Sequence, residues 1–173
     1  MKAVWAQIIG GLAILAITSS VHFKKKNHMM AMQSLAHLLF AIQYIVLDAF
    51  SAAYMDTISI IRNLIFYKFD ETKTRIPIIL PTIICIVIGI VGYFNYNGLI
   101  TLIPVIISMA YAISAAFKNP KVYKYTFGVC ILGWMYYNFH YGAYVCVIGN
   151  IIELVSTMAA LIRDLKERKK YFF

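Results

Sequence analysis

The residues that could do chemistry are a few charged and amide side chains inside long apolar stretches. Arg62 and Glu153 each lie 11 to 12 residues into such a stretch, about 16–18 Å along a helix that rises 1.5 Å per residue. In a membrane-spanning helix, an ionisable group usually faces a cavity or a partner, because its insertion costs roughly 2.5–3.5 kcal/mol. Asn150 lies three residues before Glu153 and shares its helix face. We therefore expect a central substrate site that contains Arg62, Asn63, Asn150 and Glu153.

Both charges also have simpler interpretations. Arg62 could extend toward lipid headgroups, because Lys68 follows about 9 Å further along the same helix. Glu153 could form a structural pair with Arg62, or it could be a neutral acid that is bonded to the backbone. A coupled pair of Arg62 and Glu153 across the protein interior is the expectation that a double-mutant cycle would test.

Four more residues are candidate substrate contacts, and each has an ordinary structural alternative. Asp56 could guard an outer vestibule together with Asp48, or it could be an interfacial carboxylate. His37 could relay protons, but a lone histidine is more often a hydrogen-bonded packing residue. Trp134 and Tyr44 could stack on a flat substrate from both sides, although aromatic rings near a membrane surface usually act as anchors.

Small and helix-breaking residues suggest points of bending. Gly10 and Gly11 align near Pro104 when the two halves of the chain are compared, and a proline within a helix bends it. We expect these three residues to be hinges, with close helix packing and a tolerated proline as the alternative.

Patterns of catalysis and of metal binding do not appear in the sequence. It contains no Ser-His-Asp, HExxH or paired-aspartate constellation, so we expect no enzyme. The three cysteines have no CxxC spacing, and no set of His, Cys and acid residues has metal-ligand spacing. We therefore expect neither a metal nor another cofactor.

The composition indicates what positions these residues. The chain has 173 residues, 62% of them hydrophobic and 13% charged, with a mean hydropathy of +0.76. A soluble domain has about 25% charged and 45–50% apolar residues, so a soluble globular enzyme and a disordered chain are excluded. The net charge of +9 comes from short basic clusters between apolar runs. That pattern is typical of membrane topology and not of nucleic-acid binding.

Charge-free runs and turn residues predict an all-α, polytopic membrane protein with seven transmembrane helices. We expect helices at residues 4–22, 28–48, 51–68, 76–94, 98–117, 121–139 and 141–164. Of the 16 basic residues, only Lys2 then lies on the other side from the clusters at residues 24–26, 62–75, 118–124 and 163–170. The positive-inside rule makes the clustered side cytoplasmic, with the N-terminus outside. We expect the first span to stay uncleaved, because it is too long for a signal peptide and a basic run follows it.

A weak internal repeat suggests how the helices are grouped. Ser20 aligns with Ser114 at an offset of 94 residues, and Tyr44 aligns with Trp134 at an offset of 90. Helices 1–3 then repeat as helices 5–7 in the same direction, which is a parallel repeat, although chance matching of apolar sequence is the alternative. We expect two parallel three-helix bundles and a linker with helix 4, at residues 1–68, 98–173 and 69–97 respectively.

This 3+1+3 arrangement resembles the sugar-permeating SWEET proteins and the PnuC vitamin transporters. The local sequence most resembles the YgjV-type bacterial inner-membrane proteins, in residues 7–11, the basic run after Ser19-Ser20, residues 44–53 and residues 60–64. The SWEET Pro-Gln dipeptide is absent, and Ser20-Val21 and Ser114-Ala115 stand there, so sugar transport does not carry over.

The combined expectation is a facilitative transporter in the bacterial inner membrane. It would move a small polar or aromatic metabolite, vitamin-, nucleoside- or sugar-like, by alternating access between the two bundles. The alternative is a non-transporting regulatory or assembly protein of the inner membrane. The expected partners are the lipid bilayer and a small solute, with no nucleic acid, and the protein could form a homodimer.

Overall fold

The chain folds into helices alone in the part that the structure describes. The computed structural model describes residues 2–20, 23, 26–72, 74, 76–117 and 120–170. Within these residues there are seven α-helices, one 3-10 turn and no strand, which confirms the predicted all-α fold and helix number. They are α1 (Lys2–Ser20), α2 (Lys26–Val46), α3 (Phe50–Glu71), α4 (Ile79–Phe94), η1 (Leu99–Thr101), α5 (Leu102–Ala116), α6 (Pro120–His140) and α7 (Tyr144–Lys170).

Three turns at one end of the molecule contain residues with a left-handed backbone. Asp48, Gly98 and Gly142 have φ angles of 58°, 94° and 71° and connect α2 to α3, α4 to α5, and α6 to α7. Glycine adopts this region without steric cost, and aspartate is one of the few other residues that tolerate it. These short turns make consecutive helices antiparallel.

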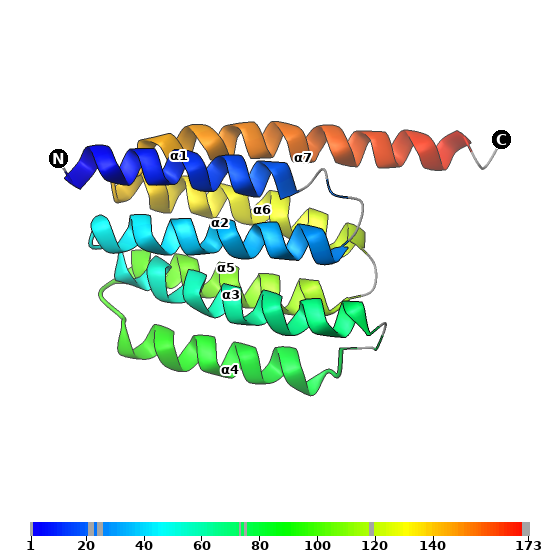
Figure 1. Cartoon of the computed structure of the whole chain (residues 1–173), viewed down its shortest axis with the longest axis horizontal. Helices are drawn as coiled ribbons and strands as arrows, with labels where there is room; N and C mark the ends of the chain where they lie inside the picture. The colour runs from blue at the N-terminus through cyan, green and yellow to red at the C-terminus, as the bar shows by residue number, and fades with distance from the viewer. Residues whose placement is uncertain are drawn as a thin grey trace.

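The helices lie side by side along the long axis of the molecule, and their directions alternate (Figure 1). The two ends of the chain therefore lie at opposite ends of the molecule. The C-terminal ends of α1, α3, α5 and α7 all lie at one end. The four basic clusters of the sequence follow these helices or overlap their C-terminal parts: residues 163–170 are the last eight residues of α7, and Arg62 and Lys68 lie within α3. Several residues of these clusters lie outside the described residues, namely Lys24, Lys25, Lys73, Arg75 and Lys118.

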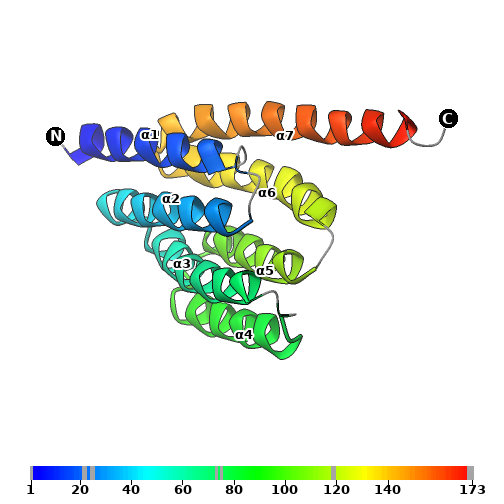
Figure 2. The ribbon, with the colours of Figure 1, turned by 45° about the vertical axis from the view of Figure 1, so that its right-hand side comes forward.

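Helices that follow one another in the chain form most of the packing. α2 packs on α1 and α3, and α6 packs on α5 and α7. The closest backbone packing between the two halves of the chain is that of α1 on α7 and of α3 on α5. α4 packs mainly on α5 and also on α3, and it lies at the edge opposite α1 and α7 (Figure 2).

The described side chains combine an apolar outer surface with several polar residues in an otherwise hydrophobic interior. Large apolar residues such as Trp5, Leu15 and Val129 are exposed on the outer faces of the helices. Polar side chains such as Gln43 and Asn138 are almost completely buried. Contiguous apolar surface on this scale is typical of a face that contacts lipid, and buried polar groups are typical of the interior of a membrane bundle.

Helix length distinguishes two segments of the described chain. The helices Lys2–Ser20 and His28–Val46 are long and apolar enough to cross a membrane. Three shorter helical stretches are also apolar, namely Ile79–Phe94, Leu99–Ser114 and Tyr144–Ala159. A bilayer core is about 30 Å thick, which takes about 20 helical residues, so α4 with its 16 residues is short for a span. The count of seven spans stays a prediction.

Candidate functional site

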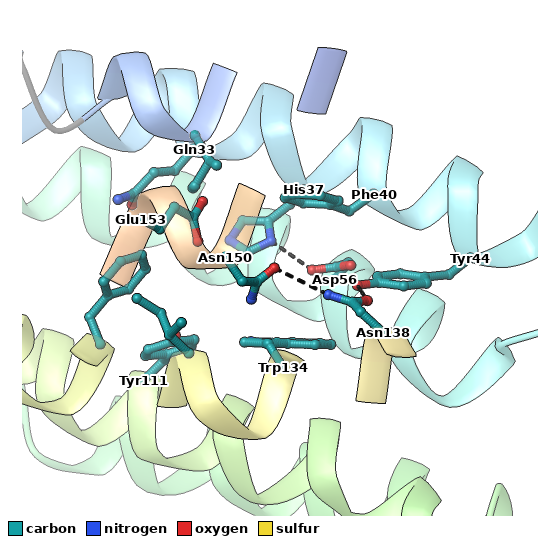
Figure 3. Close-up of a pocket in the computed structure, with 13 residues that line it drawn as sticks. Gln33, His37, Phe40, Tyr44, Asp56, Tyr111, Trp134, Asn138, Asn150 and Glu153 are labelled. Carbon is teal, nitrogen blue, oxygen red and sulfur yellow. Dashed lines mark hydrogen bonds and ion pairs between the residues drawn. The ribbon is translucent and has the colours of Figure 1, made fainter. Parts of the chain in front are cut away.

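A cavity with both polar and apolar lining residues lies between the helices of the two halves of the chain (Figure 3). Its volume is about 60 Å³, which is room for a few water molecules. Side chains from α1, α2, α3, α5, α6 and α7 line it, and no residue of α4, which is described in full, does so. The lining residues are Ile17, Gln33, His37, Phe40, Tyr44, Asp56, Tyr111, Phe127, Ile131, Trp134, Asn138, Asn150 and Glu153.

The structure brings six of the eight expected substrate contacts to this one cavity. They are His37 and Tyr44 of α2, Asp56 of α3, Trp134 of α6, and Asn150 and Glu153 of α7. The cavity walls therefore combine carboxylates, amides and aromatic rings from helices that are far apart in the sequence.

Asp56 and His37 are joined by a hydrogen bond in the wall of the cavity. The Oδ1 atom of Asp56 lies 2.7 Å from Nδ1 of His37, and Asp56 is only 3% exposed. The second carboxylate oxygen, Oδ2, is buried and accepts no hydrogen bond from the described residues. The expected outer vestibule of Asp56 and Asp48 is therefore wrong, because Asp56 turns inward to a partner on α2 and Asp48 does not line this cavity.

A chain of hydrogen bonds crosses the cavity from α2 to α7. The Tyr44 hydroxyl donates to Oδ1 of Asn138 over 2.6 Å, and Nδ2 of Asn138 donates to Oδ1 of Asn150 over 3.3 Å. All three side chains are buried. This network holds α2, α6 and α7 together on the cavity side and fixes the direction of both amides.

The rings of Tyr44 and Trp134 lie nearly parallel, with centroids 6.1 Å apart and an interplanar angle of 11°. This spacing lies within the range of two aromatic rings that pack directly on each other, 4.5–7 Å. The expectation that the two rings enclose a flat substrate is therefore not met in this conformation. The pair forms one aromatic wall of the cavity, which continues through the stacked ring of Phe40.

The structure places Arg62 and Asn63 away from this cavity. Arg62 lies six residues after Asp56, which is about 240° around a helix of 3.6 residues per turn, so it leaves α3 on another face. Its Nε and Nη2 atoms donate to Oδ1 of Asn63 over 3.2 and 3.1 Å. Asn63 lines a separate pocket of about 170 Å³ between α2 and α3.

The predicted coupling of Arg62 to Glu153 is also wrong. Glu153 lines the cavity, Arg62 does not, and the described residues contain no ion pair between them. Arg62 does not extend to the headgroups either, because its side chain is only 2% exposed. The helical register of α3 gives the physical reason: it directs Asp56, not Arg62, toward this cavity.

Comparison with known proteins gives the family. The family model Imp-YgjV, described as bacterial inner membrane protein, matches residues 4–168. The chain belongs to this family. The YgjV-type resemblance and an inner-membrane location are therefore confirmed. No curated protein and no solved structure matches the chain.

Sequence reasoning missed several lining residues of the Imp-YgjV cavity. Gln33 and Phe40 lie four residues before and three residues after His37, and Asn138 lies four residues after Trp134. Residues three or four apart share a helix face. The spacing along α2 and α6 could therefore have identified them once His37 and Trp134 were chosen. Tyr111 and Phe127 face the cavity from α5 and α6 and carried no such signal.

The charge of the Imp-YgjV cavity is negative or neutral, according to protonation. Asp56 and Glu153 are its acids, His37 is its one titratable base among the described residues, and no described Lys or Arg lines it. The described residues hold no group of three or more His, Cys, Asp or Glu side chains that could bind a metal ion. The donor set therefore suits hydrogen bonding and charge pairing.

The three candidate hinges of the Imp-YgjV chain have different surroundings. A Cβ atom at Gly10 would collide with the buried side chain of Gln43, whereas one at Gly11 would make an ordinary contact with Val145 at 3.8 Å. Gly10 therefore allows α1 to approach α2 closely. Pro104 lies in the first turn of α5, where a missing N–H costs little, so it is not a bend within a long helix. That these residues act as hinges stays a prediction.

Gln7 ties α1 to the turn between α6 and α7. Its Nε2 atom donates to the Gly142 carbonyl over 2.8 Å, and its Oε1 atom accepts from the Val145 N–H over 3.0 Å. Nearby, the Sγ of Cys146 donates to Oε1 of Gln43 over 3.0 Å. These hydrogen bonds hold α1, α2 and α7 together at the end of the molecule where the chain begins.

Proposed function

We propose that this Imp-YgjV protein is a membrane carrier for a small polar solute and that the cavity is its binding site. The observation that carries the proposal is the shared wall: α1, α2 and α3 contribute one side, and α5, α6 and α7 contribute the other. A site at the interface of two helix groups can open to either side when the groups move relative to each other. Alternating access of this kind is the transport mechanism that we infer.

The proposal includes an architecture and an orientation. The seven helices would all span the inner membrane, as two parallel three-helix bundles at residues 1–68 and 98–173 with α4 as the linker. The contacts of α2 with α1 and α3, and of α6 with α5 and α7, support this grouping. The basic clusters that follow α1 and α5 and that overlap the C-terminal parts of α3 and α7 favour a cytoplasmic C-terminus and an external N-terminus.

The residues that line the cavity favour binding and transport of a solute over catalysis. It offers amides, carboxylates and aromatic rings, which are groups that orient a polar or aromatic solute by hydrogen bonds and stacking. The proposal involves the lipid bilayer and a small solute as partners, and it assigns no enzymatic step. A single chain contains both halves of the cavity wall, so a homodimer is not required for transport.

A ligand panel on the purified protein tests the proposal. Thermal unfolding in detergent would be followed with sugars, nucleosides, vitamins and amines, first with wild type and then with Trp134→Ala. A solute at 100 times its Kd should stabilise the protein by about 2.7 kcal/mol. The control variant is Trp5→Ala, which removes an exposed ring of α1 that does not line the cavity.

Uptake into proteoliposomes then separates a carrier from a binding protein. A solute that stabilises wild type and Trp5→Ala, but not Trp134→Ala, should also enter vesicles that contain the protein. If no solute in the panel stabilises the protein or enters the vesicles, the carrier proposal fails. The regulatory or assembly role would then be the better interpretation of the hydrogen-bonded interior.

A further inference from the structure

We propose that the solute of this cavity is a small organic ammonium ion. This inference rests on the proposed function, because it names the solute class of the same site. Three independent features carry it: the charge of the lining, an unsatisfied carboxylate oxygen and the aromatic walls.

The charge of the lining selects for a cation. Two carboxylates, Asp56 and Glu153, face the cavity, and no described Lys or Arg does. With both carboxylates ionised, the lining carries a charge of −2 when His37 is neutral and −1 when His37 is protonated, and protonation of either carboxyl group raises this charge by one. The buried guanidinium of Arg62, outside the cavity, offsets part of the charge of Asp56. A positively charged solute lowers the cost of the negative charge that remains, whereas an anion raises it.

The second carboxylate oxygen of Asp56 points to a missing hydrogen-bond donor. His37 holds Oδ1 over 2.7 Å, while Oδ2 is buried and accepts no hydrogen bond from the described residues. An unsatisfied buried acceptor typically costs about 1–3 kcal/mol, and more when it is charged. An N–H group of an ammonium ion would satisfy Oδ2 and neutralise its charge. Glu153 extends from α7 toward the same space, as Figure 3 shows.

The aromatic walls favour an organic ammonium over a metal ion. Rings of Phe40, Tyr44, Tyr111, Phe127 and Trp134 line the cavity. A ring face attracts an ammonium group within about 6 Å, and it also packs against methyl or methylene groups on the nitrogen. The described residues contain no group of three or more His, Cys, Asp or Glu side chains that could hold a metal ion.

The size of the cavity limits the solute in this conformation. A volume of about 60 Å³ accommodates an ion such as methylammonium. Pockets for drug-sized ligands have about 300–1,000 Å³, so a nucleoside would require the helices to separate. The small volume therefore favours the amine over the nucleoside as occupant.

The test compares matched probes on the full-length protein in detergent. Methylammonium chloride should raise the Tm in a saturable manner, and potassium chloride at the same ionic strength should not. Methanol is a neutral alcohol with nearly the same size and shape as methylammonium. At the same concentration, methanol should leave the Tm unchanged.

Carboxylate variants locate the binding. Asp56→Asn and Glu153→Gln should each raise the methylammonium concentration at half-effect at least tenfold. The control Glu71→Gln removes the same charge at the exposed end of α3 and should leave that concentration unchanged. If Asp56→Asn does not fold, Glu153→Gln still tests the inference, because Glu153 makes no ion pair within the described residues.

Each outcome decides the inference, and its failure can be separated from failure of the carrier proposal. An equal shift with potassium or with the neutral alcohol would overturn the ammonium assignment, as would a shift that both carboxylate variants retain. If ammonium probes fail while a neutral solute binds in a Trp134-dependent manner, the carrier proposal stands and this inference is wrong. If neither cations nor neutral solutes bind, both are wrong.

Discussion

The imidazole of His37 lies 2.7 Å from the carboxylate of Asp56 and ties α2 to α3 in the wall of the cavity. The two residues are 19 positions apart and face each other across the turn at Asp48. Because Asp56 is almost fully buried, this contact replaces part of the hydration that the carboxylate loses on folding.

Replacement of both partners of this pair should destabilise the protein by less than the sum of the two single replacements. His37→Leu and Asp56→Leu should each lower the free energy of unfolding by about 1–3 kcal/mol, because each leaves a buried polar group without its partner. The double variant should lose less than the sum of the two. Thermal and denaturant unfolding in detergent would measure this double-mutant cycle.

The control cycle uses Arg62→Met and Glu153→Gln. These residues make no ion pair with each other, so their effects should add within about 0.5 kcal/mol. Additive effects for His37 and Asp56, or a large coupling between Arg62 and Glu153, would contradict the packing described above.

Tyr44→Phe should cost more stability than the same change at Tyr136. The Tyr44 hydroxyl donates to Asn138 inside the protein, and its loss leaves a buried amide oxygen without that donor, a cost of about 1–3 kcal/mol. Tyr136 is 63% exposed on α6. Tyr136→Phe should therefore leave the free energy of unfolding nearly unchanged. Equal effects of the two substitutions would mean that the network from Tyr44 to Asn150 does not stabilise the fold.

Two adjacent glycines in α1 should respond in opposite ways to alanine. Gly10→Ala would place a Cβ against the buried Gln43 side chain and should destabilise the protein by about 1–3 kcal/mol. Gly11→Ala meets only Val145 at 3.8 Å and should be neutral or stabilise the helix by up to about 1 kcal/mol. Unfolding of the two purified variants would check this. A stable Gly10→Ala variant that loses uptake would favour the hinge role.

Reporter fusions test the proposed orientation in the inner membrane. Fusions after Lys26, after Lys121 and at the C-terminus should report a cytoplasmic position, and a fusion after Asn97 should report an external one. The reason is the positive-inside rule, which places the four basic clusters in the cytoplasm. An external C-terminus would contradict the seven-span topology and the parallel arrangement of the two halves.

The helices and most of the cavity residues could be predicted because both depend on local patterns. Basic clusters and Gly- or Asn-containing turns separate the apolar runs, so the helix bounds differ from the predicted ones by only a few residues at most ends. A polar residue within an apolar run is costly unless it faces the interior. His37, Asp56, Asn150 and Glu153 were identified for that reason, and all four line the cavity.

The partners of these residues depended on helix packing and could not be predicted. The chemical argument that selected Arg62 was the same as for Asp56, but α3 directs the two side chains to different faces. The bond from Tyr44 to Asn138 joins positions 94 residues apart, and only the contact of the two halves brings them together. The same contact between the halves stacks the rings of Tyr44 and Trp134 on each other, which leaves no room for a planar substrate between them. The sequence could not show this stacking.

α4 contributes no side chain to the cavity and packs at one edge of the molecule. α4 returns the chain to the end of the molecule where α1 begins, so that α5 runs in the same direction as α1 (Figure 1). The cavity needs α4 only as this connection. The chain should therefore be divisible: two separately expressed pieces, broken between α3 and α4, retain every cavity-lining residue. Any variation in the length or sequence of α4 among related genes would then alter how the halves are connected and inserted, and leave the chemistry of the solute unchanged.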